Sequence, residues 1–120
     1  MAKFLGEHPQ IDAVLSANDG MALGVLEALK VANRTAVVIG INGILPAVKQ
    51  IETGGMLASV DFNMFKIGCT ATRAAVRHLK KQPLPEKVVL PAEVIDKTNY
   101  KAWLVPVDQR TCPEWGDVVR

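Results

Sequence analysis

The sequence predicts an α/β fold, with a parallel sheet flanked by helices. Along the first 81 residues, short apolar runs typical of buried strands alternate three times with the 3.6-residue apolar period of a helix. Strand–helix units in this order form parallel sheets whose two faces are covered by helices. The composition, 49% hydrophobic and 22% charged, is that of a globular protein, and 120 residues have room for one domain.

The first residues are typical of the end of a helix. Phe4 and Leu5 are followed by Gly6 and Pro9, which stand where a helix stops. The basic residue near Met1 is not followed by the apolar run of a secretory signal. We therefore expect the sequence to begin in the middle of a fold.

The turn signals between the apolar runs set the bounds of three strand–helix units. Asn18-Asp19-Gly20 offers a helix N-cap, Pro46 falls in a first helical turn, and Gly54-Gly55 closes a helix. The predicted strands are 12–17, 37–41 and 57–62, and the predicted helices are 21–33, 44–53 and 66–81.

Beyond Pro85 the pattern changes. Residues 87–90 and 92–95 are short strand-like runs separated by Pro91. Residues 96–120 contain two tryptophans and show no helical period, so we expect an extended chain lying across a surface.

Composition excludes several classes of protein. The formal net charge of +2 is too small to indicate a nucleic-acid partner, although residues 63–120 hold ten of the fourteen basic residues. The apolar runs are too short for a transmembrane helix. Two cysteines, Cys69 and Cys112, exclude a disulfide-rich scaffold and a cysteine zinc cluster.

The ends of the three predicted strands carry polar side chains. They read Ser16-Ala-Asn-Asp19, Gly40-Ile-Asn-Gly43 and Asp61-Phe-Asn63. In open parallel sheets, ligands bind at the carboxyl ends of the strands, so these residues predict a site for a polar ligand. The alternative is that each Asn or Asp is an ordinary cap or turn residue.

Signals for catalysis are weak. His8 and His78 have no neighbour that suggests a nucleophile or metal partner, and we expect both on the surface. The sequence contains no GxSxG, HExxH or phosphate-binding glycine loop. It therefore predicts no catalytic residue, no metal site and no cofactor. Cys69 is expected to pack in a helix, and a disulfide with Cys112 would require an oxidising compartment.

The last predicted helix carries a basic face. Arg73, Arg77, Lys80 and Lys81 stand three and four residues apart. We favour a solvated face over an acidic partner.

Three motifs resemble those of periplasmic sugar-binding proteins of the ribose-binding type, which share them with the ligand-binding domains of LacI-type repressors. Residues 16–29 resemble the family's AxND-x-xALG-xxxAL motif. Residues 38–43 resemble its VxGxDG turn, and residues 51–68 its IxxGxxxA[ST]VxQxPxxxG segment. The resemblance covers residues 4–99 and implies a partial periplasmic-binding-protein type I fold.

The resemblance also implies three ligand-binding residues. The sugar-contacting Asn of the first motif corresponds to Asn18, the Asp of the second to Asn42, and the Gln of the third to Phe62. The last two are departures: an amide replaces a carboxylate, and a phenyl ring replaces an amide. The pocket is therefore expected to be less polar than a ribose site.

The implied function is a solute-binding component of an ABC-type importer, located in the periplasm. Its partners would be a small polyhydroxylated ligand and a permease in the inner membrane. Residues 1–62 would form part of the C-terminal ligand-binding lobe. Residues 63–88 would cross a hinge into a helix of the N-terminal lobe, and residues 89–120 would be return strands and a C-terminal extension.

The apolar face of the helix at 66–81 would then lack its cover, so we expect dimerisation or association with the missing N-terminal half. Two alternatives remain open at this point. One is the effector-binding domain of a LacI-type transcriptional repressor, and the other is a small α/β enzyme, for which the sequence offers no nucleophile or base.

Overall fold

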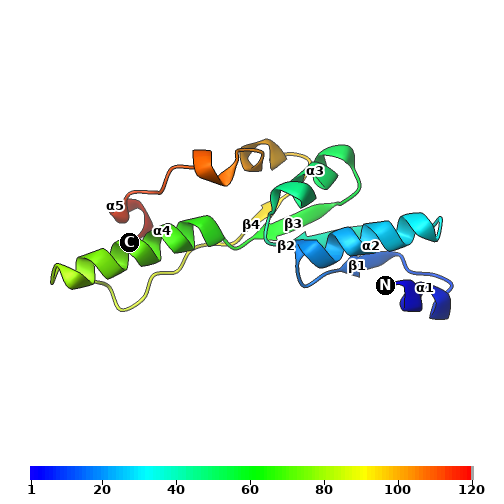
Figure 1. Ribbon diagram of the computed structural model, residues 1–120, viewed down its shortest axis with the longest axis horizontal. Coiled ribbons are helices and arrows are strands. Elements are labelled where there is room, and N and C mark those ends of the chain that lie inside the picture. Colours follow the sequence, from blue (N-terminus) through cyan, green and yellow to red (C-terminus); the bar gives the residue numbers. More distant parts are fainter. Residues whose placement is uncertain (120) are drawn as a thin grey trace.

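A four-stranded sheet forms the centre of the protein in the computed structural model, which describes residues 1–119 (Figure 1). The strand order is β1-β2-β3-β4. The first three strands are parallel, as predicted, and the fourth pairs antiparallel with β3. The strands are β1 (Ala13–Leu15), β2 (Val37–Ile41), β3 (Ala58–Asp61) and β4 (Glu93–Ile95).

The four helices before β4 agree with the sequence predictions to within a few residues. They are α1 (Ala2–Glu7), α2 (Asp19–Val31), α3 (Leu45–Thr53) and α4 (Met64–Leu79). Asn18 caps α2 as expected, and Pro46 lies in the first turn of α3. Gly54 ends α3 with φ of +85°, a conformation that glycine adopts without strain.

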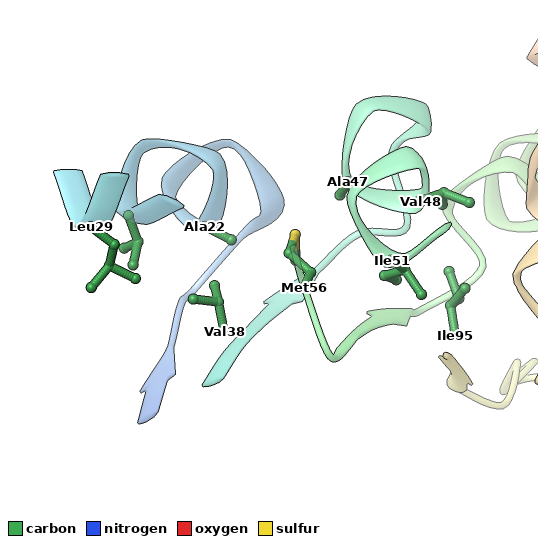
Figure 2. Close-up of a cluster of buried hydrophobic side chains, with 9 residues drawn as sticks. Ala22, Leu29, Val38, Ala47, Val48, Ile51, Met56 and Ile95 are labelled. Atoms are coloured by element: carbon green, nitrogen blue, oxygen red, sulfur yellow. The ribbon is translucent and has the colours of Figure 1, made fainter. Parts of the chain in front are cut away.

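The core lies between the sheet and the two helices α2 and α3. Figure 2 shows side chains from α2, α3 and the strands meeting in one apolar layer. Its largest fully buried apolar members are Ile51 of α3, Val38 of β2 and Ile95 of β4. Ile95 belongs to the same buried cluster as Ile51 of α3, so the antiparallel β4 contributes to this core as well.

The opposite face of the sheet is bare among the described residues, which corrects the prediction of helices on both faces. Strand β1, predicted to be buried on both faces, exposes Ala13 and 76% of Leu15. Val37 of β2 and Val94 of β4 are also exposed. The apolar runs are typical of strands buried on both faces of a sheet. The described residues, however, cover only one face of this sheet.

Helix α4 projects away from the sheet (Figure 1), and Thr70 is its one buried residue. No helix among residues 1–119 is both long and apolar enough to cross a membrane. The predicted strand at 87–90 is wrong. Val88, Val89 and Leu90 lie against α4 instead, where they line a cavity with Ile67, and no strand is there to pair with them.

The C-terminal segment is not wholly extended, contrary to the prediction. It contains two short 3-10 helices, η1 (Tyr100–Trp103) and η2 (Val107–Gln109), and a short helix, α5 (Trp115–Val118). Helix η1 packs against α3, and α5 packs against α4. The segment therefore runs from the sheet back to α4 (Figure 1).

Cys69 of α4 and Cys112 form a disulfide, with their Cα atoms 5.7 Å apart. Cys69 is thus not the packing cysteine that the sequence suggested. The bond joins residues 43 positions apart. In the chain-entropy model, closing a loop of this length lowers the entropy of the unfolded chain and thereby stabilises the folded state by about 4 kcal/mol.

The molecule is long rather than round, measuring 60 × 26 × 21 Å. Its Cα radius of gyration is 18.2 Å, whereas a compact domain of this length has about 13.6 Å. Its accessible surface of 8097 Å² likewise exceeds the roughly 6,300 Å² of a compact monomer of this mass. The excess surface comes with the bare sheet face and the projecting α4.

Replacing Gly40 by alanine should destabilise the sheet. A Cβ at this position would lie 2.2 Å from Asp19 Oδ1, so the buried carboxylate would have to move. We expect Gly40→Ala to lower the free energy of unfolding by about 2 kcal/mol in urea titrations. Gly24→Ala is the matched control, because α2 leaves open space there and alanine favours the helix by about 0.5–1 kcal/mol. Equal stability of the two variants would contradict the packing around Asp19.

Candidate ligand-binding site

The carboxyl ends of β1, β2 and β3 lie at one edge of the sheet, since the three strands are parallel. Asn18, Asn42 and Phe62 follow these strand ends, so the structure brings the three predicted site residues to one edge. Asn18 is the N-cap of α2, and its Oδ1 accepts a hydrogen bond from Met21 N at 2.9 Å. The amide NH₂ of Asn18 carries no hydrogen bond to the described protein atoms, so it is available to donate to a ligand.

Asn42 stands in a tight turn after β2. Its φ is +123°, and its backbone N donates to Val60 O at 2.8 Å, extending the pairing with β3. Gly43 follows with φ of +65°, and a Cβ there would lie 2.6 Å from Ile95 Cδ1. The turn is therefore fixed by close packing on one side and by the β3 ladder on the other.

Phe62 is 40% exposed and lies between two buried polar residues, Asp61 and Asn63. Asp61 Oδ1 accepts from Asn63 N at 2.7 Å, and Oδ2 accepts from Trp103 Nε1 at 2.9 Å. These bonds hold the chain on both sides of Phe62, whose aromatic ring is partly exposed.

Sequence reasoning treated Asp19 as a cap, but its side chain is fully buried and links the three strand ends. Asp19 Oδ1 accepts from Ser59 Oγ at 2.6 Å, and Oδ2 accepts from Ile44 N at 2.9 Å. Ser59 Oγ in turn accepts from Gly43 N at 3.1 Å. The start of α2, the turn after β2 and strand β3 are joined by one carboxylate.

The crossing from the sheet to α4 runs through Asn63, whose φ of +63° is left-handed. Its Nδ2 donates to Pro91 O and to Glu93 Oε1, so it ties the outgoing and returning chains together. Lys66 Nζ lies 3.1 Å from the same Glu93 oxygen. The hydrogen bond from Lys66 holds the pKa of Glu93 below its ordinary value, and the Asn63 amide contributes in the same direction.

A cavity of about 270 Å³ opens beside this crossing. It is lined by polar side chains from the crossing, β4 and the C-terminal segment, among them Asp61, Lys66, Glu93 and Arg110. The cavity lies beside Phe62, because Asp61 and Asn63, the residues before and after Phe62 in the sequence, both line it.

The remaining sequence candidates fall outside this edge. His8 and His78 are exposed, as expected. We expected solvent around the basic face of the last predicted helix, and this prediction is wrong for two of its four basic residues. Arg73 binds Glu114, 3.4 Å away, and Arg77 lies over the Trp115 ring, so the acidic partner comes from the chain itself. Among residues 1–119 no cluster of three potential metal ligands occurs.

Residues 1–83 match the family described as periplasmic binding protein domain. The chain is 40% identical over 83 residues to the ribose import binding protein RbsB of Bacillus subtilis, covering 68% of this chain and 27% of that protein. A solute-binding protein of Actinobacillus succinogenes solved with bound D-allose superposes with a TM-score of 0.79. That pair is 28% identical, and the match covers 84% of this chain and 36% of the other.

A further solved structure resembles nearly the whole chain. It is a twin-arginine translocation pathway signal protein of Burkholderia phytofirmans, with a TM-score of 0.81 and 28% identity, covering 98% of this chain and 39% of the other. The match confirms the predicted partial fold. The chain spans about a quarter to a third of the length of the curated relatives it matches.

Removing the Asp19 carboxylate should destabilise the whole strand edge. Asp19→Ala leaves the Ser59 hydroxyl and the Ile44 N–H buried without an acceptor, which should lower the free energy of unfolding by about 3 kcal/mol. Urea titration followed by circular dichroism measures the loss. The control is Asp12→Ala, which removes an exposed carboxylate that binds Gln10 and should change stability by less than about 0.5 kcal/mol.

The Lys66–Glu93 pair should make the crossing sensitive to acid. Because the pKa of Glu93 is lowered in the folded state, its stabilisation is present above about pH 4.3 and is lost as the pH falls through the lowered value. Both side chains are partly exposed, so we expect less than about 1 kcal/mol. Comparing unfolding of the native chain and Glu93→Gln at pH 7 and pH 3 measures it, and the difference in stability between the two proteins should be smaller at pH 3 than at pH 7.

Proposed function

The chain belongs to the periplasmic binding protein domain family, and from this premise we propose that it forms part of a solute-binding protein that delivers a small polyhydroxylated ligand to an ABC-type importer. The observation that carries the proposal is the strand edge at β1–β3. Three adjacent strand ends there offer two amides and one exposed aromatic ring. The Asp19 hydrogen bonds join the start of α2 to β3 and to the turn after β2, and the Asp61 hydrogen bonds hold the chain beside Phe62.

These side chains match the chemistry of a sugar or polyol. A hydroxyl group both donates and accepts hydrogen bonds, and an amide side chain does the same. The Phe62 ring offers an apolar wall for the C–H face of such a ligand. Asn18 supplies donors, because its oxygen is already occupied by the helix cap.

The ligand class follows from the relatives and from the departures at two positions. The similar proteins include a ribose import binding protein and a structure with bound D-allose. Asn42 is uncharged, so the site lacks the charge-assisted acceptor of a carboxylate at that position. We therefore propose a neutral sugar or polyol with fewer hydroxyls facing β2 and β3 than ribose presents.

Binding would take place between two lobes. In this proposal residues 1–62 belong to the ligand-binding lobe, residues 63–88 cross to a helix of the other lobe, and residues 89–120 return and extend. The exposed apolar side chains of α4, such as Ile67 and Leu79, support this division, since they need a cover that the described residues do not provide. Closure of the lobes around the ligand needs no covalent chemistry.

The Cys69–Cys112 disulfide favours the periplasm over the cytosol, because disulfides persist in oxidising compartments. It thereby favours the transport function over a cytosolic repressor. The permease of an importer in the inner membrane is the proposed protein partner.

The test is ligand binding by the full-length protein. Thermal unfolding and calorimetry with D-ribose, D-allose and xylitol should show at least one ligand that, at a hundred times its dissociation constant, adds about 2.7 kcal/mol of stability. Failure of every neutral sugar and polyol to stabilise the protein would overturn the proposal.

A variant of Asn18 separates ligand binding from folding. Asn18→Asp keeps an oxygen acceptor for Met21 N and therefore keeps the cap of α2, but it removes the amide donors. We expect unchanged unfolding without ligand and at least a tenfold weaker dissociation constant. Unchanged affinity would show that Asn18 does not touch the ligand.

A further inference from the structure

The C-terminal segment connects two parts of the molecule that are otherwise joined weakly. Residues 105–119, which we name the strap, leave the sheet after η1 and reach the side of α4 (Figure 1). The chain passes between the sheet and α4 at residues 62–64 and again at 88–92, and the strap is the third passage.

The start of the strap is fixed to the sheet. Trp103 donates through Nε1 to the buried Asp61 at the end of β3. Arg110 folds back to bind Val105 O at 3.0 Å and Trp103 O at 3.3 Å. The first half of the strap is therefore attached to the edge that carries the candidate ligand site.

The far end of the strap is fixed to α4 by three side chains spaced one helical turn apart. Cys69 forms the disulfide with Cys112, and Arg73 binds Pro113 O and the Glu114 carboxylate. Arg77 places its guanidinium 5.0 Å from the centre of the Trp115 ring. Of these contacts the disulfide is the covalent one, and in the Arg73–Glu114 pair the Glu114 side chain is 82% exposed.

The other two passages restrain α4 close to its pivot, where the Asn63 side chain donates to Pro91 O and Glu93 and residues 88–90 lie against the helix. Each is a single stretch of chain, and the Lys66–Glu93 pair between them is about 40% exposed on both sides. Only Thr70 of α4 is buried among the described residues. Further along α4, at Cys69, Arg73 and Arg77, the contacts that restrain the angle of the helix come from the strap.

We propose that the strap is a redox-controlled latch, in which the Cys69–Cys112 disulfide holds α4 at a fixed angle to the sheet and its reduction frees the helix to swing about the Asn63 crossing. The reductant is a dithiol, either a small molecule or a thiol–disulfide oxidoreductase. It supplies two electrons and two protons, the S–S bond becomes two thiols, and the dithiol becomes a disulfide. Both cysteines are partly exposed, so a dithiol can reach them.

The latch goes beyond ligand binding and does not depend on which ligand is bound. The length of the strap limits how far α4 can move relative to the sheet. Nine residue steps separate Trp103 from Cys112, and a chain of that length spans at most about 30 Å. After the disulfide is reduced, only noncovalent contacts hold the strap to α4. Water and dissolved salt weaken contacts of this kind.

The experiment measures the distance between the sheet and α4 in the chain. Spin labels are attached through encoded non-natural amino acids at Lys30 on α2 and Lys80 after α4, both exposed, so that the native cysteines stay in place. Double electron–electron resonance of the oxidised protein should give one narrow distribution of distances between the two labels. The reduced protein and the double variant Cys69→Ser/Cys112→Ser should give a distribution at least twice as wide.

A lengthened strap tests the latch with the disulfide intact. Six Gly/Ser residues inserted after Asp108 should widen the distribution in the oxidised protein, because the strap becomes slack. The matched control is the same insertion after Glu86, in the exposed loop between α4 and the return passage, which leaves the strap unchanged and should leave the distribution narrow. Circular dichroism confirms that the sheet stays folded in each variant.

Three outcomes would overturn the latch. One is a narrow distribution in the folded double serine variant. Another is equal widening by the two insertions, which would show that slack in the strap is not its cause. The third is absence of the Cys69–Cys112 peptide in non-reducing mass spectrometry of the oxidised protein.

Discussion

The buried carboxylate of Asp19 is the interaction on which the rest of the structure depends. A carboxylate without partners in the interior costs several kcal/mol, so its presence requires matching donors. The Ser59 hydroxyl and the Ile44 N–H provide them, and Gly40 leaves the space. Asn18 precedes this carboxylate in the chain, and the turn holding Asn42 is joined to it through Ser59. The positions of Asn18 and Asn42 therefore depend on one buried carboxylate whose hydrogen bonds are satisfied.

Much of the fold could be predicted because its signals are local. The strand Val37–Ile41 and the glycine that ends α3 follow from neighbouring residues alone. The role of Asp19 could not be predicted, since its partner Ser59 lies 40 residues away and nothing in the chain between them indicates the pairing. The strand predicted at 87–90 is wrong for a different reason: β-propensity forms a strand only beside a pairing partner, and these residues lie against α4 instead. Arg73 was assigned to solvent because Glu114 is 41 residues away.

The surface of the molecule shows two apolar areas of different origin. One is the bare sheet face with Leu15 and Val94, and the other is the exposed side of α4 with Ile67 and Leu79. Apolar area in water costs about 25 cal/mol per Å², so areas of this kind are favourable only as interfaces. One apolar area lies on the sheet and the other on α4, and these are the two parts that the crossings join. This arrangement supports the proposal that each part completes a separate lobe.

A clamp of two lobes and a covalent latch make opposite demands on the crossings. Closure needs rotation at Asn63, whose left-handed backbone is bound to Pro91 and Glu93 by side-chain hydrogen bonds that can re-form. The strap opposes large rotations but contains a reserve of length. Its three residues in η2 rise about 2 Å each and would extend to about 3.4 Å each, which adds about 4 Å. A strap of this kind permits a small hinge movement with the disulfide closed and sets a limit to a large one. The limit is covalent, whereas the crossings themselves are held by hydrogen bonds and one exposed ion pair.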